Sequence, residues 1–275
     1  MLKGTPGKIL PMLKLRPKLI ISDWDETITL EDTIKLVSEA AYLAKPNFQP
    51  PFNHFLQVYK AAYEDFNNKF LVREGRRDTI EKEIKYQIAE RQVEQTSIDE
   101  MVRRGLFAGI TPSQFASQAE KVKLRPGVVK FFEHCERLEI PVVILSINWT
   151  SIIIKEALKL NGIRLNNVDI IVNEIAFEDG KSTGEWLPNP NIRTGIDKLN
   201  VVKSLSSLHG ETWYIGDSST DLLSVLEANK GIIMKSESIL KHLNDLAIKF
   251  QPLRSPLDDA TSIFVGDWED ITNAL

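Results

Sequence analysis

The stretch from Lys18 to Thr27 places a short apolar run directly before two aspartates that are separated by one residue. Such a run is typical of a strand that is buried on both faces of a parallel sheet. Ligands of these sheets bind at the carboxyl ends of the strands, where Asp23 and Asp25 would lie. Because two carboxylates repel each other unless a cation joins them, the pattern predicts a hard metal ion such as Mg²⁺. Alternatively, the aspartates and Thr27 only cap the helix that follows.

The composition is that of an ordinary globular protein, with 275 residues, 43% of them hydrophobic, and a formal net charge of −4. An acidic chain of this kind argues against nucleic-acid binding, so an anion would need a local site. The single cysteine, Cys135, excludes an intrachain disulfide and a cysteine-rich zinc site, and the four histidines show no metal-ligand spacing. No apolar run approaches the ~20 residues of a membrane span. We therefore predict a cytoplasmic protein with no nucleic-acid partner and no membrane partner.

Apolar, β-branched runs recur along the chain and alternate with segments of helical periodicity. After the strand before Asp23, further strands are predicted at 141–145, 168–172, 212–215, 231–234 and 263–265. Helices are predicted between or after them at 127–138, 151–160, 198–208, 221–228 and 239–248, and a hairpin or flap at 177–190. Strands that alternate with helices of about ten residues predict an α/β fold with a doubly wound parallel sheet.

The segment between the first two predicted strands shows helical patterns only. Helices are predicted there at 30–43, 52–71, 79–94, 97–106 and 112–121. Thr29 is a plausible N-cap for the first of them. An all-helical block inserted after the first strand predicts a cap over the carboxyl edge of the sheet. The predicted domains are an N-terminal tail at 1–17, a core formed by 18–32 and 122–275, and a helical cap at 33–121.

Further polar residues are predicted at the same edge of the sheet, at the ends of later strands or at a helix start. These residues are Ser146, Lys198, Asp217 and Asp221. The set suits phosphoryl transfer, because Asp23 can attack as a nucleophile and form an aspartyl-phosphate. Asp25 can protonate the leaving alkoxide and then deprotonate water. A hydroxyl and a lysine can hold the phosphoryl oxygens as negative charge gathers on them, and Asp217 can complete a Mg²⁺ site.

On these residues the chain resembles the phosphatases of the haloacid dehalogenase superfamily, and most of all the phosphoserine-phosphatase-like branch with a helical cap after the first motif. Asp-Trp-Asp-Glu-Thr at 23–27 matches the first motif of that family, Asp-x-Asp-x-Thr. The apolar strand that ends in Ser146 matches the second motif, and Lys198 matches the third. Gly-Asp-Ser-Ser-Thr-Asp at 216–221 matches the fourth motif, Gly-Asp-x-x-x-Asp.

The resemblance implies a Mg²⁺-dependent phosphomonoesterase that hydrolyses a small soluble phosphate ester through an aspartyl-phosphate intermediate. The implied catalytic residues are Asp23, Asp25 and Lys198. The implied metal ligands are Asp23, Asp217 and, through its backbone carbonyl, Asp25. The candidate substrate-binding residues are Thr27, Ser146 and Asn148. Asp221 would orient Lys198 or a metal-bound water.

Other interpretations remain open. The same fold could serve a non-catalytic regulator that binds a phosphometabolite, or a hydrolase of another reaction type, such as a dehalogenase or phosphonatase. Asp25 favours phosphate esters, because an alkoxide leaving group needs an acid and a halide does not. Lys203 competes with Lys198 for the site, but five helical residues place the two about 140° apart, and Lys198 is nearer the strand ends. Asp267 imitates the fourth motif and is interpreted as a turn residue. The substrate and the oligomeric state are not predicted.

Overall fold

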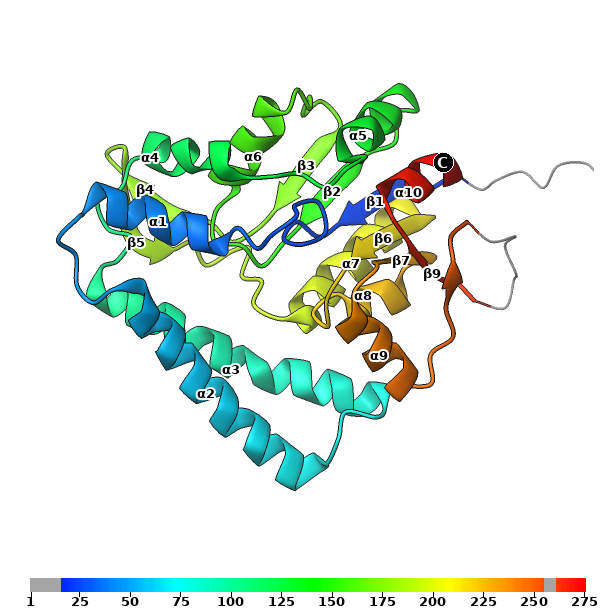
Figure 1. Cartoon of the computed structure of the whole chain (residues 1–275), viewed down its shortest axis with the longest axis horizontal. Helices are drawn as coiled ribbons and strands as arrows, with labels where there is room; N and C mark the ends of the chain where they lie inside the picture. Colours follow the sequence, from blue (N-terminus) through cyan, green and yellow to red (C-terminus); the bar gives the residue numbers. More distant parts are fainter. Residues whose placement is uncertain (1–15, 255–260) are drawn as a thin grey trace, which may run out of the picture.

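The computed structural model describes residues 16–254 and 261–275, so the predicted N-terminal tail lies outside the described residues except for its last two. Within these ranges seven strands form one sheet, in the order β3-β2-β1-β6-β7-β9-β8, and all neighbouring strands are parallel (Figure 1). The strands are β1 (Leu19–Ser22), β2 (Val142–Leu145), β3 (Val168–Ile171), β6 (Thr212–Gly216), β7 (Lys230–Met234), β8 (Gln251–Pro252) and β9 (Ile263–Gly266). All six predicted strands are confirmed. The two-residue β8 was not predicted, because a Gln-Pro pair carries no strand pattern.

Strand β1 lies in the middle of the sheet, between β2 and β6. Its last residue, Ser22, is in register with Ile144 of β2 and with Ile215 of β6. The carboxyl ends of these three strands therefore lie level with one another. Residues that follow the strands consequently meet at one edge of the sheet.

Helices cover both faces of the sheet, as a doubly wound fold requires. Ile20 of β1 packs into a buried cluster with α5 (Val128–Arg137), α6 (Ser151–Leu160) and α10 (Trp268–Ala274). Its neighbours Leu19 and Ile21 point into a second cluster on the opposite face. The helices of that second face are α7 (Gly195–His209), α8 (Leu222–Glu227) and α9 (Glu237–Asp245). The alternation along β1 thus anchors both layers to the central strand.

Helix α10 was not predicted, and the interpretation of Asp267 as a plain turn residue was wrong. Asp267 is the N-cap of α10, where its side chain accepts a hydrogen bond from the backbone of Asp270 in a capping box. Trp268 then packs on Phe131 of α5 and donates a hydrogen bond from Nε1 to the backbone oxygen of Thr27. The end of the chain therefore supports the loop that follows β1.

The segment between β1 and β2 is helical, and it is called the helical insert below. Its helices are α1 (Ile34–Ala44), α2 (Phe52–Glu74), α3 (Ile80–Arg104), α4 (Pro112–Ala116) and the 3₁₀ helix η1 (Ser117–Lys121). Figure 1 shows α2 and α3 as a long pair that projects away from the sheet. In contrast, α4 and η1 pack on α6 and belong to the same buried cluster as β1. The domain boundary at 33–121 therefore stays a prediction.

Four helix boundaries in the insert differ from the prediction, and the smallest difference is that α2 ends at Glu74 and not at 71. The helices predicted at 79–94 and 97–106 are the single helix α3, since no glycine or proline interrupts residues 80–104. Helix α1 starts at Ile34 and not at 30, because Thr29 forms a backbone bridge with Leu124 and does not act as its N-cap. The helix predicted at 112–121 divides into α4 and η1.

The predicted hairpin is confirmed as β4 (Ile175–Glu178) and β5 (Lys181–Trp186). Asp179 and Gly180 form its turn, and both have positive φ angles, as a two-residue hairpin turn favours. Ser182 exchanges backbone hydrogen bonds with the insert, donating to Ile110 and accepting from Gly109. The hairpin thus fastens the insert to the core. Among the described residues, no helix is both long and apolar enough to cross a membrane.

Candidate active site

Three aspartates meet at the carboxyl edge of the sheet. Asp23 follows β1, while Asp217 and Asp221 belong to the loop between β6 and α8. A carboxylate oxygen of each lies within 4.8 Å of the others, and all three side chains are buried. The structure thus brings together the two aspartates, Asp23 and Asp217, that the sequence predicted would share a metal ion. Asp23 and Asp217 come together because β1 and β6 end level with each other in the sheet.

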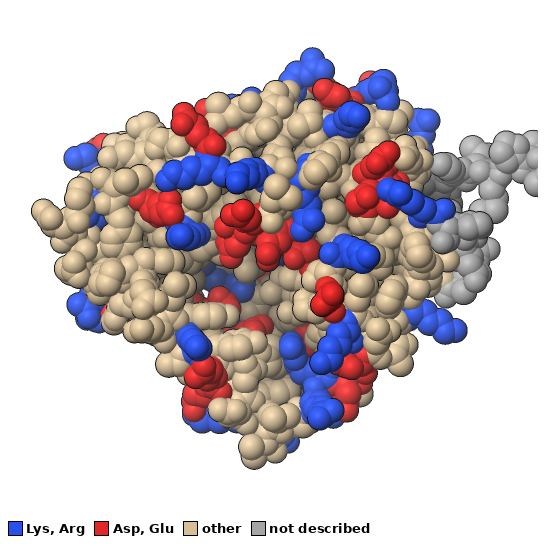
Figure 2. All heavy atoms as spheres, in the orientation of Figure 1, with Lys and Arg blue, Asp and Glu red and all other residues tan. Residues whose placement is uncertain are grey.

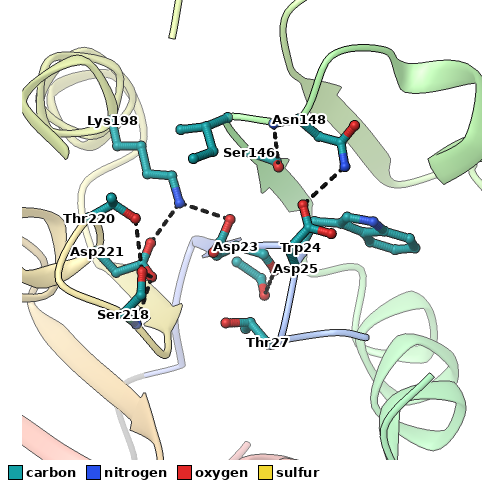
Figure 3. A network of polar contacts seen from close by, with 12 residues as sticks. Asp23, Trp24, Asp25, Thr27, Ser146, Asn148, Lys198, Ser218, Thr220 and Asp221 are labelled. Carbon is teal, nitrogen blue, oxygen red and sulfur yellow. Dashed lines mark hydrogen bonds and ion pairs between the residues drawn. The ribbon is translucent and has the colours of Figure 1, made fainter. Parts of the chain in front are cut away.

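One lysine offsets this negative charge. Lys198 is fully buried in the first turn of α7, and its Nζ lies 2.8 Å from Asp23 Oδ1 and 2.8 Å from Asp221 Oδ1 (Figure 3). Burial alone would lower the pKa of Lys198, but the charges of Asp221 and Asp23 raise it above its usual value. The rival Lys203 has a side chain that is 54% exposed and lies 3.9 Å from Glu227. The structure therefore places Lys198, and not Lys203, at the site.

Asp221 holds this lysine and the loop around it. Its Oδ1 accepts a hydrogen bond from the hydroxyl of Tyr214 at 2.6 Å, and its Oδ2 accepts hydrogen bonds from the backbone and hydroxyl of Ser218. Burial opposes its charge, but Lys198 and these hydrogen bonds bring the pKa of Asp221 below its usual value. The loop is also tight, because a Cβ atom on Gly216 would lie 2.4 Å from the side chain of Asp221.

Asp217 carries a less compensated charge. Its Oδ1 accepts a hydrogen bond from the Thr27 hydroxyl at 2.8 Å. Burial, followed by the charge of Asp221, raises the pKa of Asp217 to about 7. Burial and the charge of Asp221 likewise raise the pKa of Asp23 well above its usual value, although Lys198 opposes this. Thr27 was predicted to bind substrate, and here its hydroxyl is directed at Asp217.

Asp25 stands beside this cluster in a separate set of hydrogen bonds. Its Oδ1 accepts from the backbone and the hydroxyl of Thr33, both at 2.6 Å, and its Oδ2 accepts from Asn148 Nδ2 at 3.0 Å. Burial, followed by the charge of Asp32, raises the pKa of Asp25 to about 6. A carboxyl group with this pKa exchanges its proton close to neutral pH, which suits a general acid and base. Glu26, which lies between Asp25 and Thr27 in the sequence, is exposed.

The loop after β2 supplies the opposite wall of the site. Ser146 is fully buried, and its Oγ accepts a hydrogen bond from the backbone of Asn148 at 3.0 Å. Figure 3 shows both residues across from Lys198, on the other side of Asp23. Asn148 was predicted to bind substrate, and its side-chain amide is occupied by Asp25 and Thr33.

Several residues that shape the site were not predicted. Asn173 donates from its side-chain amide to the backbone oxygens of Asn148 and Ile192, which ties the loop after β2 to the segment before α7. Thr33 and Tyr214 position two of the aspartates, as described above. None of these residues stands in a motif, and only the fold brings them near the aspartates. Sequence patterns therefore gave no signal for them.

The aspartate cluster fits a divalent cation such as Mg²⁺. Burial and mutual repulsion raise the pKa values of two of its three carboxylates, Asp23 and Asp217. The positive charge of a cation would stabilise their ionised forms. Carboxylate oxygens are the ligands that Mg²⁺ prefers. Of the three, Asp221 already uses both oxygens to accept hydrogen bonds from Lys198, Tyr214 and Ser218. Asp23 and Asp217 are therefore better placed as ligands than Asp221.

The surface is hollowed between the α2–α3 pair and the sheet-bearing part of the molecule, and acidic and basic side chains gather around the hollow (Figure 2). Asp23 and Asp217 are only 6% and 8% exposed, so the cluster lies below the surface. A substrate would have to enter between the insert and the core.

Comparisons with known proteins find solved structures of the same fold. Among solved structures, cytosolic 5′-nucleotidase IIIB bound to cytidine matches 94% of this chain and 84% of its own, with 17% identity and a TM-score of 0.56. A phosphoserine phosphatase carrying a phospho-aspartyl intermediate analogue matches 82% of this chain and 90% of its own, with 16% identity and a TM-score of 0.51. These likenesses show that the fold is shared.

Sequence comparisons identify the family of this chain. Cold tolerance protein 1 of Saccharomyces cerevisiae is 30% identical over an alignment of 249 positions that covers 78% of this chain and 78% of its own. The mitochondrial bifunctional TH2 protein of Arabidopsis thaliana is 26% identical over 90% of this chain, which spans 45% of that larger protein. The family of haloacid dehalogenase-like hydrolases matches residues 20–224. The chain therefore belongs to the haloacid dehalogenase-like hydrolases.

Proposed function

We propose that this protein is a Mg²⁺-dependent phosphomonoesterase that hydrolyses a small phosphate ester through an aspartyl-phosphate. One observation supports the proposal above all. Asp23 is held at 2.8 Å from a fully buried lysine, at the edge of the sheet where Asp25 stands as a separate carboxyl group with a raised pKa. A nucleophile, a cation and a general acid are thus present in one place.

In the proposed reaction, a carboxylate oxygen of Asp23 attacks the phosphorus atom while the bond from phosphorus to the ester oxygen breaks. Asp25 gives its proton to the departing alkoxide, and Lys198 offsets the charge of the phosphoryl oxygens. Asp25 then takes a proton from a water molecule, which attacks the aspartyl-phosphate and frees inorganic phosphate. Thr33 and Asn148 keep Asp25 oriented through both steps.

Asp23, Asp217 and the backbone carbonyl of Asp25 would hold the Mg²⁺ ion. When bound, the ion supplies positive charge to the phosphoryl group and lowers the repulsion between the aspartates. Thr27 would support the site indirectly, because its hydroxyl orients Asp217. Ser146 remains the proposed hydroxyl ligand of the phosphoryl oxygens.

Asp25 also favours this proposal over the alternatives. A dehalogenase has no alkoxide to protonate, and a regulator that only binds a phosphometabolite needs no acid. Three hydrogen bonds hold the Asp25 carboxyl group, and its raised pKa supports a role as the acid for an alkoxide leaving group.

A phosphate-release screen over a panel of small phosphate esters, with and without Mg²⁺, tests the proposal. We expect release that depends on Mg²⁺ and disappears in Asp23→Asn. We also expect acid-quenched wild-type protein to carry a phosphoryl group on the peptide that contains Asp23. Full activity of Asp23→Asn would contradict the mechanism. Tight binding of a phosphometabolite without phosphate release would favour a regulator instead.

A further inference from the structure

One face of α3 is fastened to the core by polar side chains at a spacing of four residues. Glu83 Oε2 lies 3.3 Å from His242 Nε2 of α9. Arg91 pairs with Asp197 of α7 and donates from Nη2 to a backbone oxygen before that helix. Gln87 lies between these two contacts on the same face, because residues four apart on a helix are neighbours. On this face, α3 thus contacts α7, α9 and the loop before α8 through a line of three polar residues.

Gln87 joins two segments that carry active-site residues. Its side chain is fully buried. Its Oε1 accepts a hydrogen bond from the backbone N–H of Gly195 at 2.9 Å. Its Nε2 donates to Glu83 Oε1 of the same helix at 2.8 Å and to the backbone oxygen of Ser219 at 3.3 Å. Gly195 begins α7, three residues before Lys198, and Ser219 lies between Asp217 and Asp221.

The contact between these two segments leaves little space. A Cβ atom on Gly195 would lie 2.5 Å from the backbone oxygen of Thr220 and 3.1 Å from Gln87 Oε1. The first N–H groups of a helix have no acceptor within the helix, and Gln87 supplies one for Gly195. Loss of Gln87 would therefore leave a buried N–H group unpaired where α7 touches the loop of Asp217.

We propose that Gln87 is a positioning residue, which fixes the first turn of α7 against the loop at 218–220 and thereby sets Lys198 relative to Asp23. The expected effect of Gln87 on kcat rests on the proposed function. Lys198 reaches Asp23 and Asp221 at 2.8 Å, so a small displacement of its helix turn disturbs both contacts. Because Gln87 belongs to the insert, docking of α3 on the core adds a further restraint on the lysine.

The test replaces Gln87 and follows two quantities. Gln87→Leu removes all three hydrogen bonds of the side chain, whereas Gly195→Ala leaves that side chain intact and pushes the same contact apart. Gln95→Leu is the matched control, because Gln95 is bonded to Asp99 on the exposed side of the same helix. The first quantity is release of phosphate from an aryl phosphate with Mg²⁺, and the second is amide hydrogen exchange around Gly195 in the full chain.

For Gln87→Leu we expect kcat to fall roughly 10- to 100-fold while KM changes by less than about threefold, as for a misplaced catalytic group. Exchange around Gly195 should accelerate by about tenfold or more, since a buried hydrogen bond is lost. Gly195→Ala should show the same pattern as Gln87→Leu in both measurements. Gln95→Leu should match the wild type in both.

Several outcomes would overturn the proposal. Unchanged exchange around Gly195 would mean that Gln87 does not hold the turn. Faster exchange with unchanged kcat would mean a purely structural role, and a rise in KM alone would mean a role in substrate binding. If Gln87→Leu does not fold, Gly195→Ala decides, because the added methyl group pushes the same contact apart. If the wild type releases no phosphate from any ester, the proposed function falls, and the exchange measurement alone decides whether Gln87 fixes the turn.

Discussion

Replacing Asp217 by asparagine should stabilise the metal-free protein while removing its activity. Asp217 is 8% exposed, and its charge is disfavoured by burial and by Asp221. Asparagine has nearly the same shape and keeps an oxygen that accepts the hydrogen bond from Thr27. The substitution therefore removes one charge from the aspartate cluster without opening a cavity.

The size of the effect follows from the pKa of Asp217, which is about 7 against an ordinary value of 3.8. At 1.36 kcal/mol per pKa unit, that difference corresponds to at most ~4 kcal/mol. Relaxation of the site and its effective dielectric reduce the penalty, so we expect a gain of about 1–2 kcal/mol in the free energy of unfolding at pH 8. For a chain of this size, that is a rise of roughly 3–6 °C in Tm.

The pH dependence has a definite sign. Because the pKa is raised in the folded state, the unfolded chain gives up this proton at a lower pH than the folded protein does. Wild-type stability therefore falls as the pH rises from about 4 to 7, in proportion to the difference in bound protons. The advantage of Asp217→Asn should be near zero at pH 4 and complete at pH 8.

Denaturant titrations at pH 4 and pH 8, in a chelating buffer and in excess Mg²⁺, measure these effects. Excess Mg²⁺ should stabilise the wild type by about 2.7 kcal/mol at a concentration of 100 Kd and should have much less effect on Asp217→Asn. Asp169→Asn, a change of the same charge at an exposed position on β3, serves as control. A variant that is less stable than the wild type at pH 8 without metal would refute the electrostatic argument.

Two further predictions concern single carboxylates. Asp25→Asn should slow release of phosphate from an alkyl phosphate by roughly 10²- to 10⁴-fold. Formation of the aspartyl-phosphate from an aryl phosphate should be nearly unaffected, because an aryl leaving group needs no acid. Rapid-quench kinetics with both substrates measure these two rates. Burial and the charge of Glu94 raise the pKa of Glu90, in α3, to about 7, so Glu90→Gln should raise the stability at pH 8 by about 1–2 kcal/mol and have little effect at pH 4.5. Urea titrations at the two pH values check this, and an equal gain at both would contradict it.

The sequence was sufficient to predict the aspartate cluster because each motif is local. Asp23 and Asp217 each follow an apolar strand, and a parallel sheet gathers such residues at one edge. The choice of Lys198 over Lys203 followed from helix geometry in the same way. These predictions needed only the positions of the strands along the chain, which the apolar runs indicate, and the parallel arrangement of the sheet.

Other parts of the site depend on contacts that no periodic pattern records. Gln87 reaches Gly195 across 108 positions of sequence, and Asn148 reaches Asp25 across 123. Each of these hydrogen bonds depends on how the insert and the loops pack against the core. Helix α10 is different, because the capping box that begins at Asp267 was a readable signal for a helix. That error came from comparing Asp267 only with the fourth motif.

The contacts of α3 also restrict how a substrate can enter. We expect the helical insert to open for the substrate and to close around it. Motion of α3 would break the bonds of Gln87 to Gly195 and Ser219 and the ion pair of Arg91 with Asp197. Each broken hydrogen bond leaves polar groups to be paired by water, so an open state is accessible only if water enters with the substrate. Closure would then expel that water and restore the hydrogen bonds of Gln87 that fix the helix turn carrying Lys198. Substrate enclosure and alignment of the lysine would thus be one event.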